Sequence, residues 1–455
     1  MTSSVVRPTV AARMNRLPIG RTHKLATVAV GLGLFFDIYE VFLAGVLASV
    51  LVQEFHLSKA QTPILLSSTF VGMFVGALVL GRLADRVGRR RAFLLNLGIY
   101  SVFSLLGAFS FTPIMLVVLR FCAGIGIGAE PPLADTYLSD LLPARRRGRF
   151  IAWAYTISFL GVPAAGFLAR WLVPLHPFGI DGWRIMFVFG ALGAVIVYFL
   201  RRSLPESPRW LESVGRTKEA EEVAERFESQ ARSAGQSLDE PAAEQPPSPA
   251  GTRIGTLFRP PYGKRTGMMM IFHILQTLGY YGFGTLVPLV LAAKGYPIVQ
   301  SLLFSAVSFL GYPIGSLLSL PLVERVERKF LVTFSVLGMG ALGLAFGYSG
   351  STALVLVFGF LYTCVSNIFS NSYHIYQAEI FPTALRSTAA SGTYALSRLT
   401  SAAMPFVLVP VLNSAGAGVM FAVVATAMVL VSLTVGILGP RTTGRPLEAV
   451  NAVTA

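Results

Sequence analysis

Two short stretches with one shared pattern decide the fold: Asp140-LLPARR-Arg147 and Glu379-IFPTAL-Arg386. In each, an acid, two residues, a proline, three residues and an arginine follow one another. The second copy begins 239 positions after the first, and each closes a run of apolar segments of membrane-spanning length. The duplication predicts a membrane protein built from two related halves. Because bundles with internal repeats usually bind a substrate at mid-membrane between their halves, transport is the first hypothesis.

The composition places the chain in a lipid bilayer. Its 455 residues are 54% hydrophobic and 13% charged, with a mean hydropathy of +0.65, which is too apolar for a water-soluble domain of this length. We predict an all-α membrane protein with twelve transmembrane helices in two six-helix halves, since twelve stretches approach the ~20 residues that cross a bilayer. The expected spans are Leu25–Val52, Thr62–Leu83, Ala92–Phe111, Pro113–Leu138, Phe150–Val173, Trp183–Leu200, Gly267–Leu291, Ser301–Val323, Phe330–Tyr348, Thr352–Tyr376, Ser387–Leu412 and Ala417–Leu438.

A polar stretch separates the two sets of six spans. Its first part, Pro208–Arg232, spaces apolar residues among charges in a helical pattern, which predicts short amphipathic helices at the cytoplasmic face. Its second part, Gly235–Gly251, contains four Pro and predicts a flexible connection. The expected regions are a cytoplasmic N-terminal segment (1–24), an N-terminal bundle (25–200), cytoplasmic helices and linker (201–265), a C-terminal bundle (266–438) and a cytoplasmic tail (439–455).

The basic residues predict the orientation of the chain in the membrane. The formal net charge is +15, and most of the 37 Lys and Arg residues precede the first span or lie in loops that share one side. Because loops rich in Lys and Arg stay in the cytoplasm, we expect both termini to be cytoplasmic. We expect no removable signal peptide and no binding of nucleic acid.

Signatures of other functional classes are missing from the sequence. It holds no HExxH or GxSxG string, which argues against a membrane enzyme. It holds no GxxxxGK[ST] loop, so we expect an ion gradient rather than ATP as the driving force and no bound cofactor.

The segment between the second and third spans carries the strongest resemblance to a known family. Gly81-RLA-Asp85-Arg86-V-Gly88-Arg89-Arg90 resembles the signature loop of the major facilitator superfamily. The chain is also similar to the sugar-porter, organic-ion and synaptic-vesicle-glycoprotein branch in four further strings: Arg120-FCA-Gly124-I-Gly126-I-Gly128, Pro205-ESPRWL, Asp140 to Gly148, and Tyr376-QAEIFPTALRST.

Two longer strings, FFDIYEVFLAGVL and GAEPPLADTYLSDLLPARRRGR, resemble bacterial metabolite:proton symporters of the niacin and aromatic-acid type. This resemblance implies a location in the plasma membrane of a bacterium, that is, the inner membrane. Asp140 departs from the usual glutamate, and Glu324-RVE-Arg328-Lys329 is a degraded copy of the first loop signature. The sugar-porter fingerprint of span seven, a Gln pair followed by Ser, Gly and Asn, is not present, which weakens the case for a sugar.

Asp37 and Arg120 are the candidates for proton coupling. An ionised side chain at mid-bilayer is costly unless it is paired or faces water, and these two lie at similar depths, about 18 and 19 Å from the inner edge. The resemblance implies that they pair and carry the proton. Glu40 shares the helix face of Asp37 and could tune it or bind a cationic group. The alternative is a static buried ion pair that fixes helix register.

Arg398 is the candidate for substrate recognition. It lies about 12 residues into span eleven with no acid nearby in sequence, and the resemblance to organic-anion transporters implies that it receives a carboxylate. The alternative is an inter-helix contact with an acid or a carbonyl. An aromatic and amide lining is expected at its height, made by Tyr39, His273, Gln276, Tyr280, Tyr281, Asn367, Asn371 and Tyr373.

Charged residues at the cytoplasmic face are expected to form a gate between the halves. Weak surface ion pairs suit this role because they can break in each cycle. Glu130 and Asp135, lower in span four, are expected in such charge networks or on an exit path. The expected gate comprises Asp85, Arg86, Arg89, Arg90, Asp140 and Arg149 in one half, and Glu206, Glu379 and Arg386 in the other.

These observations together predict a secondary active transporter. It would take up a small aromatic or nicotinate-like monocarboxylate with protons, by alternating access, as a monomer in the lipid bilayer. The closest alternative is a sugar or polyol:proton symporter. An organic-ion efflux carrier and a membrane receptor without transport are the remaining, less favoured alternatives.

Overall fold

The computed structural model describes residues 8–241, 254–260, 262–381 and 383–443. Side chains at Arg82, Asp85, Ala144, Phe178, Thr256, Ala378 and 383–393 are not part of the description. The predicted gate residues Asp85 and Arg386 therefore lie outside the described side chains.

The described residues are helical and contain no strand. One bundle is formed by α2 (Arg21–Val46), α3 (Ala48–Glu54), α4 (Gln61–Val87), α5 (Arg89–Gly107), α6 (Pro113–Gly128), α7 (Glu130–Leu141), α8 (Ala144–Phe159), α9 (Gly161–Leu172) and α10 (Gly182–Arg202). The second bundle comprises α13 (Gly263–Ala293), α14 (Ile298–Phe309), α15 (Gly311–Arg325), α16 (Arg328–Tyr348), α17 (Thr352–Glu379) and α18 (Thr383–Leu438).

The prediction of twelve spans is confirmed. Ten stretches of the described chain are long and apolar enough to cross a membrane. The last of them, Tyr394–Leu438, has 45 residues and folds back at Gly416, whose φ of +83° suits a residue without a Cβ, so it supplies two spans. α5 supplies the remaining span.

Three spans are broken into two helices each. Span four breaks between α6 and α7, where Pro131 and Pro132 cannot donate backbone hydrogen bonds and suit the first turn of a new helix. Spans five and eight break just before Gly161 and Gly311. These glycines lie directly against the backbones of neighbouring helices, at Phe35 and Phe360, where a side chain would not fit.

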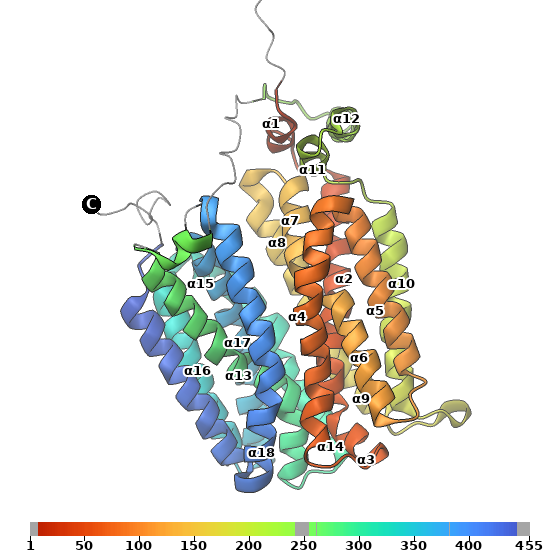
Figure 1. Cartoon of the computed structure of the whole chain (residues 1–455), viewed down its shortest axis with the longest axis vertical. Coiled ribbons are helices and arrows are strands. Elements are labelled where there is room, and N and C mark those ends of the chain that lie inside the picture. Colours follow the sequence, from red (N-terminus) through yellow and green to blue (C-terminus); the bar gives the residue numbers. More distant parts are fainter. Residues whose placement is uncertain (1–7, 242–253, 261, 382, 444–455) are drawn as a thin grey trace, which may run out of the picture.

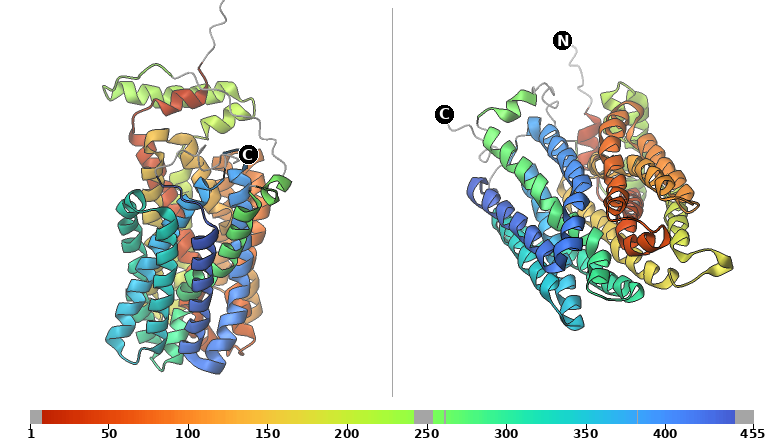
Figure 2. Two further views of the ribbon diagram at one scale, coloured as in Figure 1. Left: turned by 90° about the vertical axis from the view of Figure 1, so that its left-hand side faces the viewer. Right: turned by 60° about the horizontal axis from the view of Figure 1, so that its bottom comes forward.

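Figure 1 shows the two bundles side by side, and Figure 2 shows their arrangement from two further directions. Three short helices lie together at one end: α1 (Val10–Asn15), α11 (Pro208–Ser213) and α12 (Thr217–Ser233). We call this end the linker face. The prediction of amphipathic helices between the halves is confirmed by α11 and α12, whereas α1 was not predicted.

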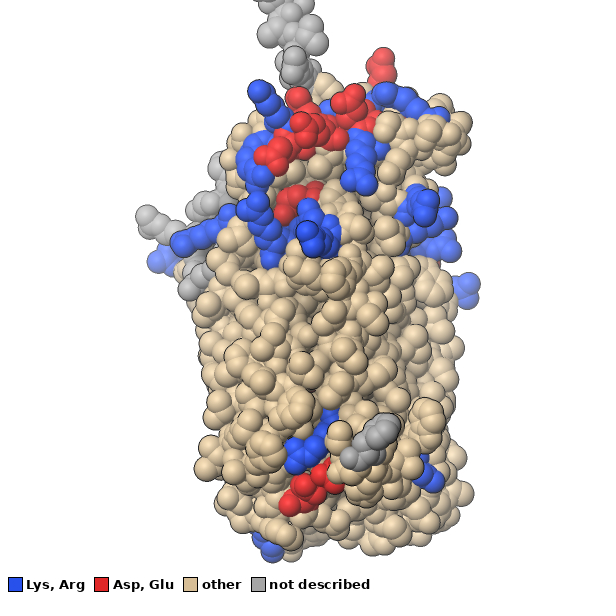
Figure 3. Space-filling model, turned by 90° about the vertical axis from the view of Figure 1, so that its right-hand side faces the viewer, with Lys and Arg blue, Asp and Glu red and all other residues tan. Residues whose placement is uncertain are grey.

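Charged and uncharged side chains lie in separate zones of the surface, as a bilayer requires. In the view of Figure 3, charged side chains gather at the linker face, a few lie near the other end, and the middle is uncharged. Large apolar side chains on membrane-spanning helices, such as Val79, Ile196 and Phe199, are exposed. An exposed apolar belt of this kind is suited to lipid rather than to water.

Candidate functional site

A layer of buried aromatic rings joins the two halves near mid-height. Phe42 of α2 stacks on Tyr281 of α13, with ring centroids 6.2 Å apart, and also contacts Tyr312 of α15 at 6.1 Å. Phe159 of α8 lies against Tyr312 at 6.4 Å. All four rings are buried. This layer is the floor of the space between the halves.

Beyond this layer, away from the linker face, the halves pack backbone to backbone. Gly45 lies so close to α13 that a Cβ on it would come within 2.6 Å of the Thr285 carbonyl oxygen. Gly166 of α9 likewise lies against Ala306 of α14. Figure 1 shows α9 and α14 at this end. At these two points the helices of the two halves are in direct contact.

On the linker side of the layer, side chains between the halves are reached by solvent. His374 of α17 is exposed, and its ring lies 6.5 Å from that of half-buried Tyr155 of α8. Asp135 of α7 is also half-buried, and it faces Tyr155. Side chains of both halves on the linker side of the layer are therefore at least partly accessible to solvent.

Arg398 lies at this space, held by two tyrosines. Its Nη1 donates to the Tyr281 hydroxyl at 2.7 Å, and its Nη2 donates to the hydroxyl of Tyr394, one helical turn earlier on α18. The guanidinium carbon lies 5.0 Å from the Tyr281 ring centre and 4.5 Å from that of Tyr394. The side chain is only 3% exposed, yet no carboxylate pairs with it within the part of the chain that the structure describes. The alternative of an inter-helix pair with an acid is therefore not what the structure shows.

Some of the predicted lining residues gather near Arg398. Tyr281 binds it directly, and Tyr280 packs edge-on against Tyr281 at 4.9 Å. Gln276 donates to Ser397 at 3.4 Å, and its Oε1 has no partner. His273 bonds with Gln377 at 2.9 Å, and Tyr373 stacks on the exposed His374 at 4.2 Å.

Three predicted lining residues serve helix packing instead. Tyr39 donates to the Met186 carbonyl at 2.9 Å, inside the first half, so its placement at the substrate site is wrong. Asn367 donates to the Tyr312 carbonyl at 2.6 Å, and Asn371 donates to Ser319 at 2.7 Å. These two amides tie α17 to α15 because short polar side chains at a close helix contact find partners across it.

The predicted Asp37–Arg120 pair does not form. Arg120 instead pairs with Glu40, one turn further along α2, and donates through Nε to Thr69 at 3.2 Å. Ser104 also donates to Glu40. Asp37 is 2% exposed and neither of its carboxylate oxygens has a hydrogen-bond partner. Glu40 takes the arginine because its longer side chain is already fixed by Ser104.

A second buried ion pair lies in the same half. Glu130 of α7 binds Arg201 of α10, and the two side chains are 0% and 1% exposed. The structure therefore does not place Glu130 in a cytoplasmic charge network, which was one of its two expected roles. The sequence predicts that Arg201 belongs to the polar linker (201–265). In the structure it is instead a buried residue of α10.

The predicted gate residues make contacts within each half. Glu206 accepts from the backbone N–H of Arg90 at 3.0 Å, so it belongs to the first half and not, as expected, to the second. Asp140 accepts from Ser207 at 2.7 Å. Glu379 pairs with Arg328 at 3.1 Å. Arg86 and Arg149 are exposed, and Arg89 is half-buried near Asp140. This arrangement fits halves that are apart at the linker face.

Twelve membrane spans in two bundles, with a buried arginine near the contact between them and buried acids in the first bundle, define a multi-pass membrane transporter of the major facilitator type. Residues 25–453 match the family described as "Sugar (and other) transporter", and the chain belongs to that family.

Relatives and solved structures agree with this assignment. The chain is 31% identical over 395 residues to the "Putative metabolite transport protein YyaJ" of Bacillus subtilis, covering 86% of each chain. It is 29% identical to the "Niacin transporter NiaP" of Acinetobacter baylyi, covering 97% of this chain and 99% of the relative. Its fold is similar to that of a D-xylose-proton symporter, with a TM-score of 0.71, 20% identity and coverage of 93% and 99%. The protein is a transporter and not an enzyme.

Proposed function

We propose that this protein takes up a small aromatic or nicotinate-like monocarboxylate together with protons, by alternating access. The observation that carries the proposal is Arg398, a buried cation between the halves that no carboxylate of the described chain neutralises. A buried charge without a counter-ion is destabilising, so a substrate anion that supplies the missing charge binds favourably.

The surroundings of Arg398 suit an aromatic acid. The tyrosine hydroxyls that accept from its guanidinium can donate their own protons to a carboxylate. The planar guanidinium favours a carboxylate that accepts two parallel hydrogen bonds. The rings of Tyr280, Tyr281 and Phe70 offer apolar faces on which a planar ring can stack. The relation to a protein named as a niacin transporter supports the same substrate class.

Asp37 is the proposed proton carrier. Among the described side chains, the core of the first half holds three buried carboxylates, Asp37, Glu40 and Glu130, but two buried guanidiniums, those of Arg120 and Arg201. An ionised carboxylate without a partner is costly in an apolar interior, so a proton on Asp37 balances the cluster. The proton gradient would then be the driving force, with no cofactor.

The orientation follows from the basic residues. We take the linker face as cytoplasmic, because loops rich in Lys and Arg favour that side. The solvent access on the linker side would then belong to the inward-open state of a protein in a bacterial inner membrane.

Transport of a sugar or polyol with protons is the second candidate. The family description favours it, since it names sugars. A neutral sugar would leave the charge of Arg398 uncompensated, which is why we prefer the anion.

Thermal unfolding of the purified protein in detergent tests the substrate class. A ligand that binds only the folded protein stabilises it by RT ln(1 + [L]/Kd), about 2.7 kcal/mol at 100 times Kd. We expect nicotinate and benzoate to raise the Tm of the wild type and not of Arg398→Ala. Arg184→Ala is the matched control, because Arg184 binds backbone carbonyls far from the site and its loss should leave the ligand shift intact. Stabilisation by sugars alone, retained in Arg398→Ala, would overturn the proposal.

A further inference from the structure

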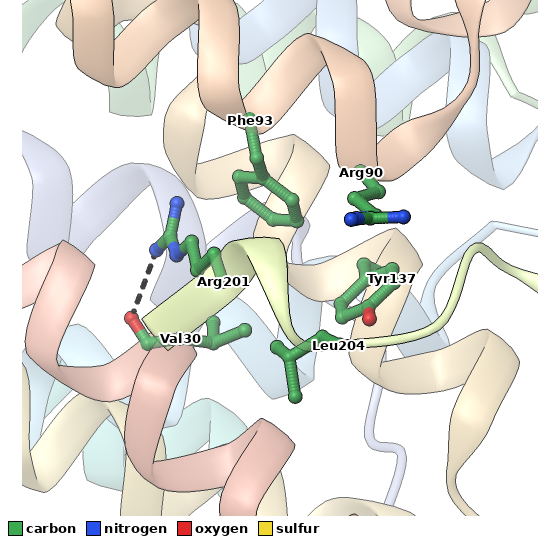
Figure 4. Close-up of a pocket in the computed structure, with 6 residues that line it drawn as sticks. All are labelled: Val30, Arg90, Phe93, Tyr137, Arg201 and Leu204. Carbon is green, nitrogen blue, oxygen red and sulfur yellow. Dashed lines mark hydrogen bonds between the residues drawn. The ribbon is translucent and has the colours of Figure 1, made fainter. Parts of the chain in front are cut away.

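Arg201 lies against the face of α2 that carries Asp37. Its Nε and Nη2 donate to the carbonyls of Ala29 and Val30 at 3.4 and 3.2 Å. Figure 4 shows the bond to Val30 and the ring of Phe93 beside the guanidinium, whose carbon lies 4.2 Å from the ring centre. Gly33 allows this approach, because a Cβ at Gly33 would overlap the guanidinium.

Asp37 lies on the helix face of α2 that Arg201 approaches. It follows Gly33 by four residues, and residues four apart on a helix share a face. Its charge interacts with those of Arg201 and Glu130. The charged and titratable groups that act on Asp37 are Glu40 on its own helix, Tyr100 on α5, Glu130 on α7 and Arg201 on α10, whereas Arg120 on α6 pairs with Glu40.

Not every carboxylate oxygen near Arg201 accepts a hydrogen bond. It binds Oε1 of Glu130, whereas Oε2 of Glu130 and both oxygens of Asp37 have no hydrogen-bond partner. Arg120 is directed elsewhere, because the Glu40 carboxylate, the Glu40 carbonyl and the Thr69 hydroxyl accept from three of its five N–H groups. One guanidinium therefore faces two carboxylates.

We infer that Arg201 is a counter-ion shared by Glu130 and Asp37, and that it moves toward Asp37 when Asp37 releases its proton. With Asp37 protonated the two ion pairs leave the cluster neutral, which fits a carboxyl group that makes no hydrogen bond in the structure. Release of the proton to water leaves one net negative charge, and Arg201 then lies between two anions. Its role as a positioning residue in transport rests on the proposed proton coupling.

The location of Arg201 connects this exchange to the linker face. Arg201 is the penultimate residue of α10, and the carbonyl of the next residue, Arg202, accepts from the guanidinium of Arg90. The backbone of Arg90 is in turn bound by Glu206. A shift of Arg201 toward Asp37 would pull on the end of α10 that these contacts hold.

Two substitutions should shift the pH midpoint of Asp37 protonation in opposite directions. Glu130→Gln removes the competing anion, so Arg201 favours ionised Asp37. Gly33→Ala introduces a methyl group where the guanidinium lies and displaces it from α2. The readout is the infrared C=O band of a protonated carboxylic acid in detergent-purified protein, assigned to Asp37 by its loss in Asp37→Asn.

We expect the pH midpoint of this band to fall by about one unit in Glu130→Gln and to rise by about one unit in Gly33→Ala, because a nearby charge shifts a carboxyl titration by one to three units. Asp181→Asn, which removes the same charge at a half-buried ion pair with Arg184, should leave it unchanged. Unchanged midpoints in both variants, or a wild type without the Asp37 band, overturn the inference. The titration needs no substrate, so its result is independent of whether nicotinate is transported.

Discussion

Tyr394 is the residue that holds the Arg398 side chain in place beside it on α18. Its hydroxyl accepts from Nη2 and its ring lies under the guanidinium, so the arginine side chain is fixed before a ligand arrives. Fixing a binding group in advance reduces the entropy lost on binding.

Tyr394→Phe should therefore weaken nicotinate binding without abolishing it. The loss of one hydrogen bond is worth about 1 kcal/mol, which corresponds to a Kd about fivefold higher by isothermal titration calorimetry. Tyr198→Phe, at a half-buried position on α10, should bind like the wild type. An unaltered Kd in Tyr394→Phe would remove Tyr394 from the site.

Single residues could be predicted from the sequence where depth in the membrane alone identified them. Asp37, Arg120 and Arg398 were found because a charge inside an apolar span is conspicuous. Their partners could not be predicted in the same way. Arg120 pairs with Glu40 rather than Asp37, and this depends on how α2 is rotated and on the contact of Glu40 with Ser104. Tyr394 carried a usable signal, because it precedes Arg398 by four residues and so shares its face.

At the scale of elements, α1 is attached to the linker helices by charge. Arg13 and Arg16 bind the Glu228 carboxylate of α12 at 2.9 and 2.8 Å. Val10 and Met14 bury their apolar side chains beside them. The N-terminal segment is thereby fastened to the helices that join the two halves.

Glu228→Gln should loosen this attachment. Hydrogen bonds between charged groups contribute about 1.5 to 3 kcal/mol, so we expect hydrogen exchange of the α1 amides to accelerate at least about tenfold. Glu222→Gln, an exposed position on the same helix, is the control. Equal exchange in the two variants would show that apolar burial alone holds α1.

The same contact sets a pH dependence. Burial opposes ionisation of Glu228, but the hydrogen bonds and charges of Arg13 and Arg16 outweigh it and lower the pKa of this carboxyl from 4.5 to about 2. A lowered pKa stabilises the folded form above the unfolded pKa. Protection of α1 should thus be complete above about pH 4.5 and be lost as the pH falls through about 2.

The elements themselves were largely predictable. Spans of about 20 apolar residues separated by charged loops leave little choice of position, and the pattern of Trp210, Leu211 and Phe227 indicated α11 and α12. The breaks in spans five and eight could not be predicted, because they depend on how closely Gly161 and Gly311 approach neighbouring helices. α1 was missed because its six residues are too short for a periodic signal.

At the scale of the whole molecule, the two halves are closed at one end and apart at the other. The aromatic layer and the glycine contacts at Gly45 and Gly166 close the end away from the linker face, whereas His374 is exposed on the linker side. A carrier that alternates between two such states must break the first set of contacts and form new ones at the linker face. The structure fits one end point of that cycle.

Uptake into proteoliposomes with an imposed proton gradient tests the central claim most directly. Labelled nicotinate would be added outside wild-type and Asp37→Asn vesicles, with and without an inward proton gradient. We predict that the gradient drives accumulation in the wild type, that an ionophore abolishes it, and that Asp37→Asn only equilibrates the label because it cannot exchange a proton. Accumulation by Asp37→Asn equal to the wild type, or wild-type uptake that ignores the gradient, would contradict proton-coupled transport through Asp37.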